Sequence, residues 1–321
     1  MKKRKVVIDC DPGIDDVLAL LLAFSSPELE VIGITIVAGN VPVEIGAKNA
    51  RKALQMVGRL DIPIYLGDNK PIKRTLVTAQ ETHGKDGIGE CNFEEIDVYQ
   101  NSISAVEYLV NTFSENKDIE LIALGPLTNI AKSLAINLNL YNHFDKLVTM
   151  GGAFKSHGNC SPVAEYNYWV DPHGADYVYK NIKCPIHMIG LDVTRKIVLN
   201  PNIREGLRLI DTKLSNFIYK ITQFYVDFHW EWEGILGCVI NDPLAVAYFI
   251  DDGLCNGFDA YTEIVTDGPA MGQSIIDSKH FYKADANATI LTQVDAEKFM
   301  NMFLNRIEPD KFDVLKRAKV I

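Results

Sequence analysis

The stretch Lys5–Phe24, KVVIDCDPGIDDVLALLLAF, decides the fold of this chain. It opens with the β-branched run Val6–Ile8, which is typical of a buried strand. Pro12 and Gly13 then supply turn chemistry. The run Val17–Phe24 is almost wholly apolar and too short to span a membrane, so it predicts a buried helix. The stretch therefore predicts a strand, a sharp turn and a helix in immediate succession.

Four carboxylates gather in the turn between that strand and helix: Asp9, Asp11, Asp15 and Asp16. Asp9 and Asp11 are two residues apart, so they point to one side of an extended chain. Asp15 and Asp16 fall in the first helical turn, where the helix dipole favours negative charge. A helix cap explains one of these acids well and a second tolerably. Because the four repel one another at a strand's carboxyl end, where open α/β sheets place their sites, they indicate a bound hard divalent cation.

The same residues resemble the N-terminal signature of the nucleoside hydrolases, the calcium-dependent N-ribohydrolases of the inosine-uridine-preferring kind. The family pattern is Asp-x-Asp-Pro-Gly-x-Asp-Asp, and Asp9–Asp16 matches it at every fixed position. The segment His83–Gly89 resembles the family's His-Gly-x-x-Gly segment, which borders the substrate pocket. Gly125–Asn129 is similar to the second signature, and Gly158–Asn167 to the ribose-binding segment. The resemblance therefore extends over most of the chain.

Composition limits the classes of protein that fit this chain. It has 321 residues, and its apolar content of 47% supports an ample core. A net charge of −10 without an evident basic patch argues against nucleic-acid binding. The basic start Met1–Lys5 lacks the apolar stretch of a signal peptide, and no segment has the length and unbroken apolarity of a membrane span. Six scattered cysteines without a CxxC pair fit a reducing compartment, so we expect a cytoplasmic protein.

Strand and helix patterns alternate along the chain, which predicts β–α–β crossovers and a mainly parallel sheet. Further strands are expected at 30–37, 62–66, 119–124, 146–150, 185–190, 261–266 and 289–293, and helices at 47–57, 101–116, 128–136, 201–210, 213–228 and 295–307, with others after Pro172 and Pro243. The segment 67–100 has little periodicity, and a loop that long is usually functional or disordered. We therefore predict one domain over 1–321, an α/β fold with an open, Rossmann-like sheet flanked by helices, the nucleoside hydrolase fold.

The resemblance implies a reaction and a role for each matching residue. The reaction is hydrolysis of the N-glycosidic bond of ribonucleosides to ribose and free base, with a calcium-bound water activated by Asp11. The implied protein ligands of calcium are Asp11, Asp16, Asp242 and the backbone carbonyl of Leu124. The implied ribose contacts are Asp15, Asn40, Asn159, Glu165 and Asn167, with Met150 beneath the sugar and Asp9 supporting the metal ligands. Amide donors and a carboxylate acceptor are also the groups that suit sugar hydroxyls.

One position departs from the family pattern. Many members have His-Asp-Pro where this chain has Asn241, Asp242 and Pro243, and that histidine is their leaving-group acid. An asparagine can hydrogen-bond a departing base but cannot protonate it. Asn241 and His83 are therefore candidate catalytic residues, with His229 or an aromatic stack near Trp230 as further substitutes for the missing acid.

Two other functions stay open at this point. Asp9 and Asp11 after the first strand resemble the nucleophile motif of haloacid dehalogenase phosphohydrolases, although that family expects Thr or Val where Gly13 stands. Asn241 also leaves open a calcium-stabilised nucleoside-binding protein with little turnover. The expected partners are a small-molecule nucleoside and further copies of the chain, because the resemblance implies a homodimer or homotetramer. Nucleic acid and membranes are not expected partners.

Overall fold

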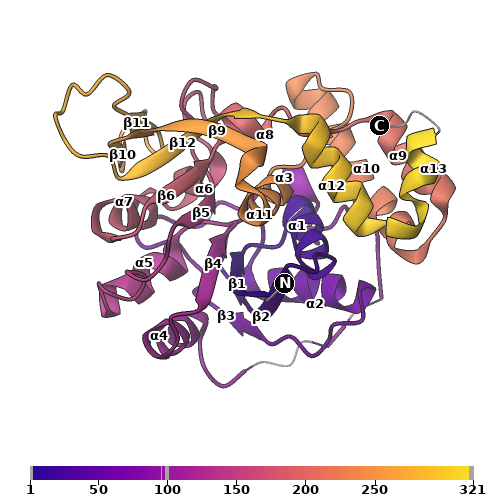
Figure 1. The fold of residues 1–321 in the computed structure, drawn as a ribbon, viewed down its shortest axis with the longest axis horizontal. Helices are drawn as coiled ribbons and strands as arrows, with labels where there is room; N and C mark the ends of the chain where they lie inside the picture. Colours follow the sequence, from indigo (N-terminus) through magenta and orange to yellow (C-terminus); the bar gives the residue numbers. More distant parts are fainter. Residues whose placement is uncertain (1–2, 95, 98–100, 318–321) are drawn as a thin grey trace.

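A computed structural model describes residues 3–94, 96–97 and 101–317. Its centre is an eight-stranded sheet with the order β3-β2-β1-β4-β5-β6-β12-β9 (Figure 1). These strands are β1 (Arg4–Cys10), β2 (Leu29–Ile36), β3 (Ile64–Leu66), β4 (Ile119–Ala123), β5 (Leu147–Met150), β6 (Ile186–Ile189), β9 (Cys255–Ala260) and β12 (Ala288–Val294). Neighbouring strands are parallel except for β12 and β9. The expected open, mainly parallel sheet is confirmed.

Helices cover both faces of this sheet because both faces of its central strand are apolar. Side chains alternate along β1, so Val6 and Ile8 pack into one apolar cluster and Val7 into the other. The first cluster includes α1 (Ile14–Phe24), α2 (Val43–Met56), α10 (Lys213–Glu233), α11 (Asp242–Ile250) and α12 (Ala296–Ile307), and the second α4 (Ala105–Glu115), α5 (Thr128–Ile136) and α7 (Pro172–Asn181). Figure 1 shows α4, α5 and α7 gathered on one side of the sheet and α1 and α11 on the other.

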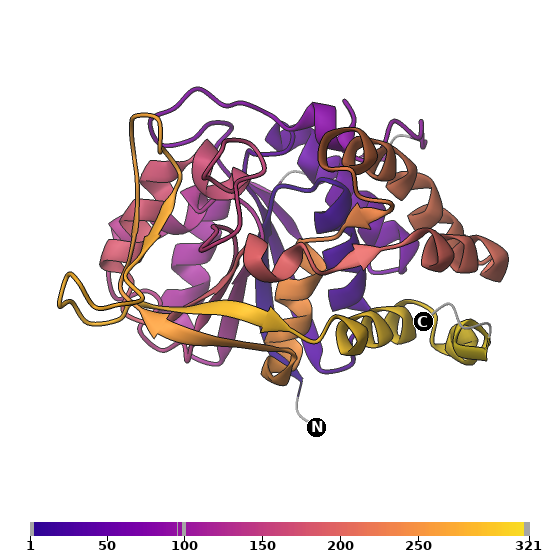
Figure 2. The same cartoon turned by 90° about the horizontal axis from the view of Figure 1, so that it is seen from above.

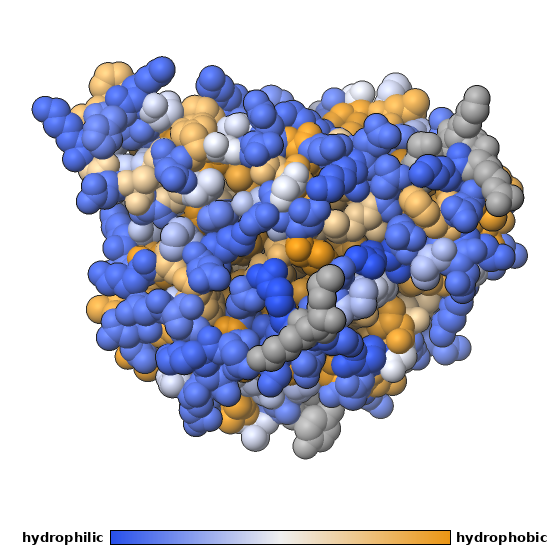
Figure 3. Space-filling view, in the orientation of Figure 1, coloured by the Kyte–Doolittle hydropathy of each residue, from blue (hydrophilic) through white to orange (hydrophobic). Residues whose placement is uncertain are grey.

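Shorter elements connect and extend this framework. They are the helices α3 (Gln80–His83), α6 (Tyr166–Val170), α8 (Leu191–Thr194), α9 (Pro201–Ile210) and α13 (Phe312–Arg317), the 3₁₀ turns at Asp252–Leu254 and Pro309–Lys311, and the strand pairs β7 (Val198–Leu199) with β8 (Cys238–Val239) and β10 (Thr262–Ile264) with β11 (Ser274–Ile276). Figure 2 shows the loops around β10 and β11 projecting beyond the sheet. Figure 3 shows polar residues over much of one face, with apolar residues in small patches. None of the helices described combines the length and apolarity that a bilayer crossing needs.

The sheet order also decides where a site can lie. From β1 the chain adds β2 and β3 on one side, and then returns to add β4 on the other. In open α/β sheets, ligands bind outside the carboxyl ends of strands at such a reversal. Leu124, the residue after β4, donates its N–H to the carbonyl of Asp9 in β1 over 2.8 Å. The acidic turn after β1 therefore lies beside the end of β4.

Most expected elements are confirmed within a few residues, and two differ. The expected strand at 261–266 is the hairpin strand β10, while the edge position beside β12 belongs to β9. The glycine-containing sequence of β9, CNGFDA, is half exposed and has no apolar run to mark it. Helix α10 runs to Glu233 and not to about 228, because its termination signal is Gly234 in the left-handed conformation, with φ of 65°. The interpretation as one domain over 1–321 stays a prediction. Met1 and Lys2 of the basic start, and residues 95 and 98–100 of the long loop, lie outside the described residues.

The described part of the segment 67–100 is tied to the acidic turn. Asn49 of α2 donates from Nδ2 to the carbonyl of Pro12 over 2.9 Å and to that of Asp86 over 2.8 Å. Three residues before Asp86, α3 ends at His83, which is only 4% exposed. The segment is therefore a wall of the region above the sheet.

Candidate active site

A cavity of about 530 Å³ opens above the carboxyl ends of the central strands. Asp11, Leu124 and Met150 line its floor, from the ends of β1, β4 and β5 respectively. Asp15 at the start of α1 and Asp242 at the start of α11 also line it. The residues that the sequence separates by more than 200 positions therefore meet at the reversal of the strand order.

The carboxylate of Asp11 is held between two glycines. A Cβ atom at Gly39 would lie 2.0 Å from Oδ2 of Asp11, and one at Gly125 would lie 2.5 Å from Oδ1. Oδ2 accepts a hydrogen bond from the backbone N–H of Asn40 over 2.7 Å. The absence of side chains at these two positions thus makes room for the carboxylate between the loops that follow β2 and β4.

Three carboxylates lie close enough together to share one metal ion. One oxygen from each of Asp15, Asp16 and Asp242 lies within 4.8 Å of the others. Asp16 also caps α1, because its oxygens accept from the backbone N–H groups of Asp11 over 3.2 Å and Gly13 over 3.0 Å. Helix capping therefore accounts in part for the presence of an acid at Asp16. The cluster contains Asp15, whereas the sequence led us to expect Asp11 among the metal ligands.

Burial and mutual repulsion act together on these acids. The pKa of Asp11 is raised well above its usual value, first by burial and then by the charge of Asp16. Burial, followed by the charge of Asp15, raises the pKa of Asp16 to about 7. The pKa of Asp242 is also raised well above its usual value, by burial and then by Asp16. A cation would favour the ionised forms, and hard carboxylate oxygens are the ligands that calcium or magnesium prefers, so the donor set fits such a metal.

The expected calcium ligand Leu124 and the expected sugar ligand Asn167 contact each other. Asn167 donates from Nδ2 to the carbonyl of Leu124 over 2.7 Å and to that of Met150 over 3.2 Å. Glu165 caps α6 and accepts from the N–H groups of Asn167 over 2.8 Å and Gly152 over 2.9 Å. Burial nevertheless raises the pKa of Glu165 to about 7. These residues form a rigid polar wall beside the cavity floor.

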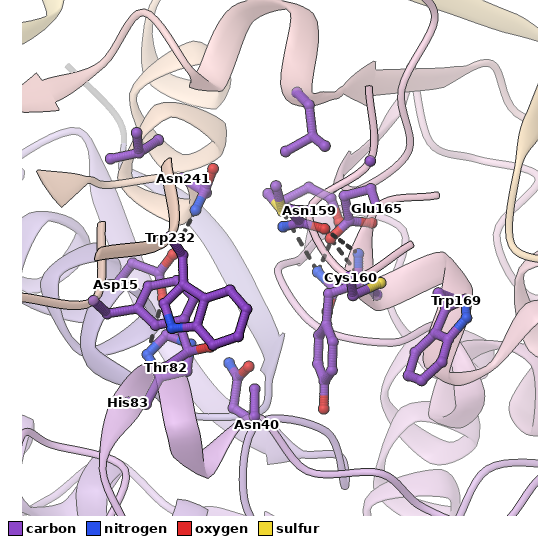
Figure 4. A pocket seen from close by; sticks show the side chains of 18 of the residues that line it. Asp15, Asn40, Thr82, His83, Asn159, Cys160, Glu165, Trp169, Trp232 and Asn241 are labelled. Carbon is purple, nitrogen blue, oxygen red and sulfur yellow. Dashed lines mark hydrogen bonds and ion pairs between the residues drawn. The ribbon is translucent and has the colours of Figure 1, made fainter. Parts of the chain in front are cut away.

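The two other expected sugar ligands have different surroundings. Asn40 is 7% exposed, and its Nδ2 donates to Oδ2 of Asp16 over 3.1 Å. Asn159 is exposed at the rim, and its Oδ1 accepts from the N–H of Tyr166 over 3.0 Å. Figure 4 shows Asn159 and Glu165 on one side of the cavity and Asp15 across from them. All the expected sugar ligands therefore line one cavity.

Opposite the polar wall, α10 supplies an aromatic wall. Tyr225, Phe228, His229 and Trp232 line the cavity, and their spacing of three and four residues places them on one face of the helix. Phe228 and Trp232 stack with ring centroids 6.2 Å apart. Trp230, near which we expected an aromatic stack, is 61% exposed and lies outside the cavity lining. This wall could be recognised in the sequence from its helical spacing only if the helix were expected to reach Glu233, because His229 and Trp232 lie beyond residue 228.

Asn241, the residue that departs from the family pattern, lies next to Asp15. Its Nδ2 donates to Oδ2 of Asp15 over 3.0 Å and to the hydroxyl of Tyr225 over 3.2 Å. The Tyr225 hydroxyl in turn donates to the same oxygen of Asp15 over 3.0 Å. Asn241 Oδ1 is buried without a hydrogen-bond partner among the described residues. The side chain is therefore engaged in orienting Asp15.

Comparison with known proteins agrees with this geometry. The model of the family described as inosine-uridine preferring nucleoside hydrolase matches residues 6–301. The pyrimidine-specific ribonucleoside hydrolase RihA of Photobacterium profundum is 34% identical over 308 residues, which are 95% of this chain and 98% of that protein. A solved plant nucleoside hydrolase, PpNRh1, superposes with a TM-score of 0.90 at 29% identity, over 95% of this chain and 99% of that one.

A second solved structure has the same fold, but its name gives a preference for purine and not for pyrimidine nucleosides. The purine-preferring ribonucleoside hydrolase from Gardnerella vaginalis superposes with a TM-score of 0.87 at 32% identity, over 94% of this chain and 98% of that one. The sequence signature, the sheet with its acidic cavity and these relatives agree. The chain therefore belongs to the family of inosine-uridine preferring nucleoside hydrolases, enzymes that hydrolyse the N-glycosidic bond of ribonucleosides.

Proposed function

We propose that this ribonucleoside hydrolase uses one calcium ion, held by Asp11, Asp16, Asp242 and the carbonyl of Leu124. The observation that carries the proposal is the group of buried carboxylates at the reversal of the strand order, where one oxygen from each of Asp15, Asp16 and Asp242 lies within 4.8 Å of the others. When bound, the cation supplies positive charge that acidifies water and attracts the hydroxyls of ribose. Asp15 lies within the same cluster and shares the neutralisation.

In this proposal Asp11 is the general base. Its side chain is 1% exposed and confined between Gly39 and Gly125, so its position is defined before substrate binds. Oδ2 of Asp11 accepts a hydrogen bond from the backbone N–H of Asn40, so Oδ1 is the oxygen that would accept the proton of the attacking water. Burial keeps the carboxylate basic in the absence of a cation, as the raised pKa indicates.

The polar wall would hold the sugar. Cleavage of a glycosidic bond passes through an oxocarbenium-like sugar, whose geometry is stabilised by contacts to its hydroxyls. We assign ribose contacts to Asp15, Asn40, Asn159, Glu165 and Asn167, with Met150 beneath the ring. Because Glu165 and Asn167 are fixed by backbone N–H groups and carbonyls, little ordering is needed when ribose binds.

The two other functions considered from the sequence are less well supported. Membership of the nucleoside hydrolases excludes assignment to the haloacid dehalogenase phosphohydrolases, and the relatives named above are hydrolases, which argues against a protein that only binds nucleosides. Release of ribose from a panel of ribonucleosides, with and without a chelator, tests the proposal. We expect release from at least one nucleoside and its loss on chelation.

A variant identifies the residue responsible. Asp11→Ala is expected to abolish ribose release while the circular dichroism spectrum is kept, because both a metal contact and the base are lost. Glu297→Ala, at an exposed position of α12, is the matched control and should keep full activity. A folded and active Asp11→Ala enzyme would refute the assignment.

We also propose a cytoplasmic location and a homodimer or homotetramer. The location is supported by the six cysteines, all of which are free thiols in the structure. The assembly rests on the family resemblance, and light scattering of the purified protein tests it. A monomeric mass would contradict it.

A further inference from the structure

Hydrolysis of a nucleoside needs a proton for the departing base, and Asn241 cannot supply one. Three histidines line the cavity: the exposed His157 in the loop before Asn159, and two buried ones, His83 at the end of α3 and His229 on α10, each 4% exposed. The ring of His83 is held by a backbone N–H, which donates, and the ring of His229 by a backbone carbonyl, which accepts. That difference decides which of them can carry a proton on the nitrogen that is free to meet a substrate.

His83 is held in a neutral form. Its Nδ1 lies 3.1 Å from the backbone nitrogen of Ile14. A backbone N–H can only donate, so Nδ1 must be the acceptor and the ring proton is on Nε2. Adding a second proton at Nδ1 would set two N–H groups against each other, although Oδ1 of Asp15 lies 3.9 Å away. Burial also lowers the pKa of His83, so this ring is a neutral donor and not an acid.

His229 has the opposite arrangement. Its Nδ1 lies 2.8 Å from the backbone carbonyl of Tyr225, one helical turn earlier. A carbonyl can only accept, so Nδ1 carries a proton at all times and Nε2 is the nitrogen that titrates. Protonation at Nε2 leaves the bond to the Tyr225 carbonyl intact and strengthens it, because charged donors form stronger hydrogen bonds. The ring also packs edge-on against the Tyr225 ring, with centroids 4.4 Å apart, which keeps its orientation.

Charged or titratable groups from three other elements face His229. Glu233 lies one turn later on α10, Asp15 comes from α1, His83 from α3, and Arg195 directly follows α8. Glu233 forms an ion pair with Arg195 over 3.5 Å, so these two charges largely offset each other. Burial is the largest influence and lowers the pKa of His229, while the Tyr225 carbonyl, Glu233 and Asp15 oppose it. The ring therefore loses its proton readily once it is protonated.

The base of a bound nucleoside is expected beside this ring. Of the assigned sugar-binding groups, Asn159, Glu165 and Asn167 lie across the cavity from Asp15. Phe228 and Trp232 offer stacked aromatic faces on the same side of α10 as His229. Aromatic rings are the natural contact for a nucleobase. A ribose held against the polar wall thus directs its base towards His229.

We propose that His229 is the catalytic acid that protonates the departing base through Nε2, in place of the histidine that many family members have where this chain has Asn241. The proposal rests on the proposed function. As the bond between C1′ and the base nitrogen breaks, its electron pair goes to the base, and the proton on Nε2 moves to a base nitrogen. The hydroxyl of water bonds to C1′, and the other proton of that water goes to Asp11. Transfer of a proton from Asp11 to solvent and from solvent to His229 restores the enzyme.

The test compares substrates that differ in their need for a proton. Inosine and uridine need a protonated leaving group, whereas p-nitrophenyl riboside does not. General acid catalysis is typically worth about 10²–10⁴ in rate, so His229→Gln should slow the nucleosides about that much more than it slows p-nitrophenyl riboside. His83→Gln is the matched control, and it should slow both kinds of substrate by similar factors. Equal slowing of both substrates by His229→Gln, or selective slowing by His83→Gln, would overturn the proposal.

The pH profile of the wild type gives a second reading that needs no variant. With His229 as acid, kcat/KM for the nucleosides should decline towards high pH while kcat/KM for p-nitrophenyl riboside does not. Identical alkaline limbs for the two substrates would overturn the assignment of His229 and leave the proposed hydrolase function intact. Failure of the wild type to cleave any of the three substrates would overturn both.

Discussion

Asn241 donates a hydrogen bond from Nδ2 to Oδ2 of Asp15 over 3.0 Å, and so joins the start of α11 to the first turn of α1. A carboxylate accepts and never donates, so the amide nitrogen is the atom that must face it. The same oxygen accepts from the hydroxyl of Tyr225. Asn241 therefore orients an acid of the carboxylate cluster, which explains how an asparagine is accommodated at the position that departs from the family pattern.

Asn241→Asp replaces the amide that donates to Asp15 with a carboxylate of nearly the same shape, so attraction becomes repulsion. Two carboxylates would then lie about 3 Å apart, one hydrogen bond to a charged group would be lost, and such bonds are worth about 1.5–3 kcal/mol. We expect kcat/KM to fall about 10- to 100-fold. The fall should be larger at higher pH, because the charge of Asp15 raises the pKa of the introduced carboxyl group, which ionises only as pH increases. Steady-state kinetics from pH 6 to 9 measure this, and Asn142→Asp at an exposed position is the control. A pH-independent loss would contradict the account.

Protein purified without added metal should contain calcium near one equivalent per chain. The donors are hard oxygens, which favours calcium or magnesium over zinc. Elemental analysis measures the content, and Asp242→Asn should lower it because Asp242 contributes one of the clustered oxygens. Asp252→Asn, whose side chain is 72% exposed, is a matched control from just beyond the end of α11. Zinc in the purified protein, or full activity after removal of all metal, would contradict the assignment.

The metal-free enzyme should become less stable as pH rises. The pKa values of Asp9 and Asp16 are raised from 3.8 to about 7, chiefly by burial. Between pH 4 and 7 the native state then binds more protons than the unfolded state, so the free energy of unfolding falls as pH increases. Chelated protein should melt at a higher temperature at pH 5 than at pH 8, and calcium should remove this difference.

A variant at Asp9 measures how much this one carboxyl group contributes to the loss of stability with rising pH. Asp9→Asn removes a titrating group while it keeps an oxygen for Thr35, which donates to Oδ1 of Asp9 over 2.5 Å. Scanning calorimetry of the chelated variant should show a smaller decline in melting temperature between pH 5 and 8. A melting temperature of the chelated wild type that rises over this range would refute the explanation.

Ribonucleosides should be strongly preferred over 2′-deoxynucleosides. Asp15 and Asn167 are 4% and 5% exposed, so a missing hydroxyl would leave buried polar groups without a partner. Sites built to bind a hydroxyl reject the analogue that lacks it by about 10⁴–10⁵. The ratio of kcat/KM for uridine and 2′-deoxyuridine measures this preference, and comparable values would contradict the ribose contacts.

The sequence by itself determined the features that depend on near neighbours in the chain. The strand, turn and helix of Arg4–Phe24, and the clustering of Asp11, Asp15 and Asp16, follow from local backbone geometry and spacing. The alternation of strands and helices was sufficient to predict a parallel sheet, because parallel strands require crossover helices. Strand β9 and the end of α10 were misjudged, since one lacks an apolar run and the other continues through an aromatic and acidic patch.

Only the tertiary structure decided which distant groups meet and in what chemical state. Asp242 reaches Asp15 and Asp16 because α11 packs on α1, and Asn241 is thereby brought to Asp15. The proton positions on His83 and His229 depend on a backbone N–H and a backbone carbonyl, which every non-proline residue possesses and no sequence pattern distinguishes. The identity of the catalytic acid is therefore a property of packing, because packing alone determines which backbone group each ring nitrogen meets.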